Sequence, residues 1–432
     1  MMEIAFLDSA ESGFSTKLEQ LLASIMELDP ELALQVREIL AAIKTRGDQA
    51  LLEFTNRFDR RTAGIQDLVV RPETARSALA SMPDDLRAAL QAAADRIRNY
   101  HEHQKSDSWF YEDSEGNLLG QQVTPLDHVG VYVPGGRADY PSSVLMNVIP
   151  AQVAGVQDII MVAPAPQGNL SPVVLAAASL LGIESIFSIG GAQAIGALAY
   201  GTKSVPAVDK IVGPGGRYVT EAKRQVFGIT GIDMLAGPSE VVVVSDGNSN
   251  PDWVAMDMFA QAEHDEAARA ILICTDQEFI GAVAASIDRL LPEMERAPII
   301  RQSLVQNGLF IKVADLQEAA DVVNRIAPEH LELSVLDPQT LLRDIRHAGA
   351  IFLGSYAAEA LGDYCAGPNH VLPTARSARF SSPLGVYDFQ KRSSVLMCTE
   401  DSAGRIAPVA SRLARGEGLT AHARAAEYRM KK

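Results

Sequence analysis

The sequence has few cysteines, no excess of positive charge and no long apolar run. Cys274, Cys365 and Cys398 are odd in number and far apart, which argues against a disulfide framework. Lys and Arg total 38 against 54 Asp and Glu, and the net charge of −16 disfavours binding to nucleic acid or anionic membranes. The longest apolar stretch, residues 170–183, is interrupted by Ser and Pro and is too short to cross a bilayer.

The first residues also lack the basic region and apolar run of a secretory signal peptide, so we expect a cytoplasmic protein. The composition is that of a folded chain, with 47% hydrophobic and 21% charged residues. A length of 432 residues predicts two to three domains with a large core.

Two sectors of the chain alternate between strand and helix patterns, which predicts parallel β-α-β units. The strand candidates are residues 129–133, 159–162, 186–189, 210–212, 241–244, 270–274, 309–313 and 350–353. The helix candidates among them are residues 142–156, 171–181, 192–200, 219–227, 253–262 and 277–290. Before residue 125 the spacing predicts only helices, over 18–26, 30–45 and 71–104, and the tail from residue 402 predicts two polar helical segments.

No Gly-x-Gly-x-x-Gly fingerprint of a dinucleotide site follows any strand candidate. Glycine-rich loops occur instead at 130–136, 190–196 and 213–216, each after an apolar run. Each loop alone is explained by tight-turn geometry. Three of them after successive strands favour a ligand that contacts the backbone, such as a dinucleotide bound in an atypical way.

Glu329 and His330 stand side by side directly after Pro328. A carboxylate and an imidazole are the groups that proton transfer needs. Pro328 ends the helical pattern over 316–325, and if it opens a new turn, the positive helix end would keep His330 neutral. An ordinary helix start with an acidic first turn explains the same residues.

Candidate metal ligands are spread along the chain. Gln261 and His264 are three residues apart and share a helix face, and Asp363 is a carboxylate in a glycine-rich loop. His422 follows Thr420, a good N-cap, so we expect it in a first helical turn and neutral. Together these nitrogen and oxygen donors would suit zinc, although each residue alone has a common structural explanation.

Other reactive side chains have simpler explanations. We expect His101, His103 and His128 at the surface because their neighbours are polar or mixed, and His347 at the end of a helical stretch. Cys365 is a candidate nucleophile, but no basic residue near it in the sequence would generate a thiolate. We therefore expect an inert cysteine.

Taken together, several motifs make the chain resemble histidinol dehydrogenase from about residue 30 to the C-terminus. The motifs occupy residues 130–136, 231–240, 261–264, 327–331, 367–374, 379–384 and 418–422. The resemblance implies a zinc-dependent homodimer that oxidises L-histidinol to L-histidine in two steps, each reducing one NAD. It makes His330 the general base and Glu329 the residue that activates water on the aldehyde intermediate. The implied zinc ligands are Gln261, His264, Asp363 and His422.

The resemblance also implies further contacts. The substrate-binding positions are Ser239, Gln261, His264, His330, Asp363, His370, Glu417 and His422. Tyr132, Gln193 and Gly216 match positions at the NAD site, but the family usually has Asn where this chain has Gly216. A lost hydrogen bond to a neutral group is worth about 0.5–1.5 kcal/mol, so NAD would bind several-fold more weakly.

The expected fold is α/β, with two atypical, incomplete Rossmann-like parallel-sheet domains, a helical N-terminal segment and a helical C-terminal arm. The expected boundaries are 1–27 for the N-terminal segment, 28–130 plus 241–380 for the catalytic and metal-binding domain, 131–240 for the domain with the NAD loops, and 381–432 for the arm. The arm has little core of its own, so we expect it to pack on the partner subunit and to complete its site with Glu417 and His422.

Two alternatives remain open at this point. One is a paralogous zinc- and NAD-dependent alcohol dehydrogenase that acts on another small polar alcohol. The other is a non-catalytic metal- or nucleotide-binding protein, for which changes at Glu329 and His330 would affect nothing except stability.

Overall fold

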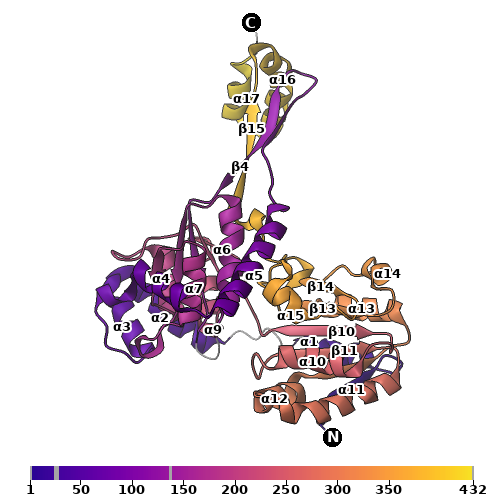
Figure 1. Ribbon diagram of the computed structural model, residues 1–432. Helices are drawn as coiled ribbons and strands as arrows, with labels where there is room; N and C mark the ends of the chain where they lie inside the picture. Colours follow the sequence, from indigo (N-terminus) through magenta and orange to yellow (C-terminus); the bar gives the residue numbers. More distant parts are fainter. Residues whose placement is uncertain (1, 24–28, 136–138, 431–432) are drawn as a thin grey trace.

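The computed structural model describes residues 2–23, 29–135 and 139–430 and contains two six-stranded sheets and a projecting arm (Figure 1). The first sheet is entirely parallel. Its order is β1 (Ala5–Asp8), β12 (Leu309–Lys312), β11 (Arg269–Cys274), β10 (Glu240–Ser245), β13 (His330–Ser334) and β14 (Ala350–Leu353).

Helices cover both faces of this sheet, so its central strands carry apolar residues on both sides. In β10, Val242 and Val244 face the core cluster that includes α1 (Phe14–Ala23) and α13 (Leu316–Ile326). Val241 and Val243 face the opposite cluster. That cluster includes α10 (Pro251–Ala262), α11 (Gln277–Leu290) and α12 (Ala297–Asn307), and the short helices α14 (Pro338–Leu342) and α15 (Glu359–Leu361) complete this half.

The second sheet has the order β2 (Val69–Val70), β7 (Ser185–Phe187), β6 (Asp158–Val162), β5 (His128–Tyr132), β8 (Lys210–Val212) and β9 (Gly231–Ile232). All neighbours are parallel except β2 and β7. The helices that contribute to one core cluster are α2 (Pro30–Arg46), α3 (Asp48–Phe58), α8 (Gly191–Tyr200) and α9 (Arg217–Val226). Those of the opposite cluster are α4 (Pro72–Ser81), α5 (Asp84–Glu102), α6 (Pro141–Ala154) and α7 (Pro172–Leu180).

The arm projects from the body and consists of a small sheet and two helices (Figure 1). Its antiparallel strands are β15 (Gln390–Met397), β4 (Leu118–Pro125) and β3 (Trp109–Glu112), and its helices are α16 (Glu400–Gly416) and α17 (Thr420–Glu427). Two segments more than 260 residues apart in the sequence therefore build one projection. No helix among the described residues is long and apolar enough to span a membrane.

The expected α/β class is confirmed, but the packing differs from the expected domain boundaries. Strand β1 places the N-terminal segment in the sheet with 240–353. The helices α2 to α5 pack on the second sheet, not on the sheet that carries residues 241–380, because their apolar faces are buried against α6 to α9. The arm is also larger than residues 381–432, since β3 and β4 belong to it. The helix expected over 18–26 is described only to Ala23, and residue 136 of the first glycine loop lies outside the described residues.

Candidate functional site

Pro328 and Glu329 lead into a strand, not into the expected helix. Helix α13 ends at Ile326, and its C-cap Ala327 adopts a left-handed conformation with φ of 50°. His330 is then the first residue of β13 and is level with Val241 of β10 and Ala350 of β14. The Glu329-His330 pair therefore lies at the amino end of an inner strand of the sheet, next to the edge strand β14.

His330 lies among buried carboxylates. Its Nε2 is 3.3 Å from an oxygen of Asp363, and its Nδ1 is 3.3 Å from the carbonyl oxygen of Glu240. Burial lowers the pKa of His330, but the carboxylates of Glu359, Glu329 and Asp363 raise it by more. The net pKa of His330 is well above its usual value. The expected helix N-terminus is therefore wrong: His330 begins a strand, and the charge that surrounds it is negative.

Glu329 is 6% exposed and is fixed by the neighbouring strand. Its Oε2 accepts a hydrogen bond of 2.9 Å from the backbone N–H of Glu240 and lies 3.8 Å from Nδ1 of His330. Burial raises the pKa of Glu329 to about 7, against the opposing effect of His330. Such a carboxyl group changes protonation near neutral pH, as a general base must.

The C-terminal end of α10 brings Gln261 and His264 to the same place. Gln261 is fully buried, and with its amide nitrogen turned toward the acceptors it donates to both oxygens of Glu359, at 3.1 and 3.2 Å. Burial lowers the pKa of His264, partly offset by Asp363, so this imidazole favours the neutral form that binds metals. Burial raises the pKa of Asp363, but His330 lowers it to a net value below the usual one.

Glu359 is a site residue that the sequence analysis missed. Ligand atoms of His330, Glu359 and Asp363 all lie within 4.8 Å of one another and could hold a metal ion. Glu359 and Asp363 are four residues apart, across α15 and the following π-helical turn Gly362–Ala366. That spacing puts two carboxylates on one helical face, and this pattern in the sequence would have indicated Glu359 as a partner of Asp363. The burial of Glu359, 3% exposed, could not be foreseen from its neighbours.

His422 and Glu417 do not join this group within one chain. Both are exposed on the arm, which points away from α10 and α15 (Figure 1). His422 lies in the first turn of α17 as expected, but Thr420 is the first helical residue and Leu419 is the N-cap. Three of the four expected metal ligands are thus together, and the fourth is at the end of the projection.

Two expected substrate-binding residues flank the site. Ser239 directly precedes β10, and its carbonyl oxygen accepts a hydrogen bond of 3.0 Å from the backbone of Arg269. Nε2 of His370 is buried without a hydrogen-bond partner among the described residues. Burial lowers the pKa of His370, against the opposing charge of Asp363. A buried, unpartnered nitrogen is costly and is explained if a ligand supplies the partner.

The expected cofactor loops follow the carboxyl ends of β5, β7 and β8 in the second sheet. The Tyr132 hydroxyl at the end of β5 accepts a hydrogen bond of 3.1 Å from Gly191 N–H. Gln193 is 1% exposed, and its Oε1 has no partner among the described residues. Gly216 is the N-cap of α9. The strand order reverses between β5 and β8, which is where nucleotides bind in open α/β sheets.

The remaining histidines lie outside this chemistry, and Cys365 donates a hydrogen bond to the carbonyl oxygen of Leu361 at 3.6 Å. His101 is fully buried in α5, with Nδ1 2.8 Å from the carbonyl oxygen of Ile97, so its expected surface position is wrong. His103 and His128 are exposed as expected. His347 lies in a loop after α14 and not at a helix end. His101 follows Ile97 by four residues and shares the buried face of α5, so the helical spacing of the apolar residues was the available signal.

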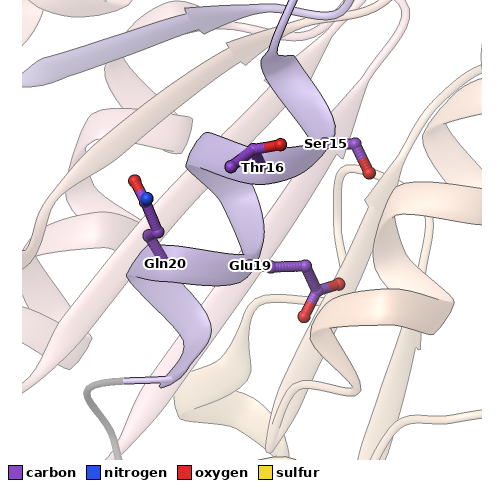
Figure 2. A pocket seen from close by; sticks show the side chains of 4 residues that line it. All are labelled: Ser15, Thr16, Glu19 and Gln20. Atoms are coloured by element: carbon purple, nitrogen blue, oxygen red, sulfur yellow. The ribbon is translucent and has the colours of Figure 1, made fainter.

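A hollow of about 430 Å³ lies along α1 and is lined by Ser15, Thr16, Glu19 and Gln20 (Figure 2). The Glu19 carboxylate is already paired with Arg325 at 3.1 Å and with Arg376 at 3.4 Å. All lining residues come from α1, and none of them belongs to the cluster around Glu329 and His330. We therefore do not assign the functional site to this hollow.

The whole chain is similar to known histidinol dehydrogenases. Residues 26–430 match the family model described as histidinol dehydrogenase. The histidinol dehydrogenases of Chromobacterium violaceum and Pseudomonas aeruginosa are each 59% identical over 425 residues, covering 98% of this chain and 98% and 97% of theirs. The crystal structure of histidinol dehydrogenase from Elizabethkingia anophelis has a TM-score of 0.94 at 34% identity and covers 99% of this chain and 98% of that one. The resemblance is confirmed, and the chain belongs to the histidinol dehydrogenase family.

Proposed function

We propose that this protein oxidises L-histidinol to L-histidine through the aldehyde and reduces two NAD in the process. The observation that carries the proposal is the buried Glu329-His330 pair, which touches Asp363 and Glu240 at the amino end of β13. An imidazole and a carboxyl group with a pKa of about 7 are the groups that two successive oxidations need. The family membership of the chain supports the same substrate.

His330 and Glu329 have different tasks in this proposal. His330 accepts the hydroxyl proton in each oxidation through Nε2, which exchanges its contact with Asp363 for the substrate hydroxyl, while the Glu240 carbonyl oxygen holds the ring through Nδ1. A divalent cation on Asp363 would offset the negative charge that favours the imidazolium. Glu329 removes a proton from the water that adds to the aldehyde. The backbone N–H of Glu240 fixes the Glu329 carboxylate for this step.

Zinc is the metal that the donor set fits. Gln261, His264 and Asp363 offer nitrogen and oxygen atoms, and the excess of buried carboxylates around His330 would be offset by a divalent cation. When bound, zinc supplies a positive anchor for the imidazole and amine of the substrate. We assign the fourth ligand to His422 of a second copy of the chain.

A homodimer with shared active sites explains the arm. The arm carries large apolar side chains that solvent reaches in the single chain, namely Trp109, Phe110, Tyr111, Leu396, Met397, Val409 and Leu413. Such a surface is typical of a protein-protein interface. The projection then brings Glu417 and His422 to the body of the partner.

NAD is assigned to the three loops at the carboxyl ends of the second sheet. The unpartnered Oε1 of Gln193 can accept a hydrogen bond from the cofactor, and Gly216 leaves the N-terminus of α9 open. When bound, NAD accepts the hydride. The residues of the chain contribute binding and orientation of the cofactor.

The proposal is tested by counting NADH formed from a limiting amount of L-histidinol by the zinc-loaded enzyme. We expect about two NADH per histidinol, and L-histidine as the product. Absence of turnover, or a yield of one NADH with the aldehyde as the final product, would contradict it. The same assay without added substrate measures background reduction.

A further inference from the structure

A buried ion pair lies next to the third cofactor loop. Lys223 of α9 pairs with Asp233, which follows β9, and the two side chains are only 3% and 1% exposed. Charged side chains are rarely buried to this extent unless they are paired. The pair is remote from the Glu329-His330 site in the sequence and takes no part in the proton transfers proposed above.

Both charged groups bind the backbone of Gly213. Lys223 Nζ donates to the Gly213 carbonyl oxygen at 3.0 Å, and the Gly213 N–H donates to Asp233 Oδ2 at 2.7 Å. The other oxygen of Asp233 accepts a hydrogen bond of 2.6 Å from Met234 N–H. The peptide groups on both sides of Gly213 are thus held by charge-assisted hydrogen bonds, which are stronger than neutral ones.

Gly213 in turn contacts the other two loops. Its φ of 108° is left-handed, and a Cβ there would lie 2.1 Å from the carbonyl oxygen of Tyr132, so only glycine fits. The Tyr132 hydroxyl accepts the hydrogen bond from Gly191. A continuous path of contacts therefore runs from the Lys223-Asp233 pair through Gly213 and Tyr132 to Gly191.

We propose that Lys223 and Asp233 are positioning residues that set the affinity for the dinucleotide by fixing the Gly213–Gly216 turn. The inference rests on the proposed NAD site. The side chains act through the backbone, since both are buried and their hydrogen bonds go to Gly213 and Met234. Apolar residues of similar volume often replace a buried ion pair without loss of stability, so stability alone does not account for the pair. The held turn is preorganised for its ligand, which lowers the cost of binding.

The test replaces the pair by Lys223→Met with Asp233→Leu, which removes both bonds to Gly213 without leaving a single buried charge. We expect the NAD Kd to rise by about tenfold or more, while zinc content and the KM for histidinol change by less than about twofold. The matched control is Glu221→Leu with Arg224→Met on the same helix. This pair, at 2.6 Å, hydrogen-bonds to Gln225 and to no described residue of the three loops, so its NAD Kd should stay within about twofold of the unsubstituted enzyme.

An unchanged NAD Kd in the Lys223→Met/Asp233→Leu enzyme would overturn the inference. If this enzyme shows no cooperative thermal unfolding, Lys223→Met with Asp233→Asn replaces it, because Asn still accepts the Gly213 hydrogen bond and no buried charge is left unpaired. We then expect a several-fold weaker NAD Kd at an unchanged KM for histidinol. Equal changes in the NAD Kd and in the KM for histidinol would indicate a general structural role and contradict the inference. Absence of NAD binding by the unsubstituted enzyme would instead contradict the proposed function itself.

Discussion

At the scale of single residues, the site depends on the contrast between two adjacent side chains. Glu329 and His330 are both nearly inaccessible, yet their neighbours differ: a backbone N–H binds Glu329, and Asp363 binds Nε2 of His330. Such contacts can be made only after distant strands have assembled. The sequence predicted the pair and its chemistry, but the charge that most raises the pKa of His330 comes from Glu359, a residue that the sequence did not single out.

Substitutions at the pair should separate the two oxidations. Glu329→Gln keeps the size and a hydrogen-bond acceptor but removes the base for water, so we expect the aldehyde step to slow by about 100-fold or more and the alcohol step to change little. His330→Ala should slow both steps. Rapid-mixing measurements of NADH formation with histidinol and with histidinal give the two rates. Equal effects of the two substitutions on both steps would contradict this division.

The pH dependence of aldehyde oxidation should report Glu329. Burial raises the pKa of this carboxyl group to about 7, so the group is protonated and inactive as a base at lower pH. We therefore expect the rate with histidinal to increase as the pH rises through about 7. In Glu329→Gln this part of the profile should disappear, and its persistence would assign the titration to another group.

Gly216 offers a substitution that gains an interaction. The backbone φ of −66° suits any residue, and a Cβ there meets no atom within 4 Å. We expect Gly216→Asn to lower the KM for NAD several-fold, since one added hydrogen bond is worth about 0.5–1.5 kcal/mol. Gly216→Ala is the control for the loss of glycine flexibility. If Asn and Ala give the same KM, the amide makes no contact with NAD.

At the scale of elements, long periodic segments were predictable and short strands near the site were not. All eight strand candidates between 129 and 353 correspond to strands or their ends, because buried parallel strands are continuous β-branched runs. The chain after Pro328 was expected to be helical but forms β13, since pairing with β10 and β14 overrides the local signal. Strands β3, β4 and β15 were missed because all three lie partly or fully exposed, and because β15 pairs with β4 across a large sequence separation.

A substitution at the N-cap of α13 tests how far the Glu329-His330 site depends on the stability of this helix, which precedes the site in the chain. Asp315 accepts a hydrogen bond of 2.9 Å from the backbone N–H of Glu318. Asp315→Ala should lower the free energy of unfolding by about 1 kcal/mol, measured by urea titration, and leave kcat nearly unchanged. Asp321→Ala, an exposed position of the same helix, is the control and should have little effect. A large fall in kcat at unchanged stability would contradict this separation.

At the scale of the whole molecule, one chain does not bring all four expected metal ligands together. The body brings together Gln261, His264 and Asp363, whereas the arm carries His422 away from them (Figure 1). The sequence predicted an arm with little core but could not show that β3 and β4 help to build it. An exchange of arms between two copies would explain two features together. It would cover the exposed apolar side chains of the arm, and it would bring His422 to the site of the partner.

The most direct test of this account mixes two inactive chains, one with His330→Ala and one with His422→Ala, by unfolding and refolding them together. If the arm serves the partner, the mixed dimer has one site with both substitutions and one site with neither, so histidinol-dependent NADH formation should return. Refolding each chain alone is the control and should give no activity. Full inactivity of the mixture, with mixed dimers verified by mass, would show that each site uses its own His422 or none, and would contradict the account.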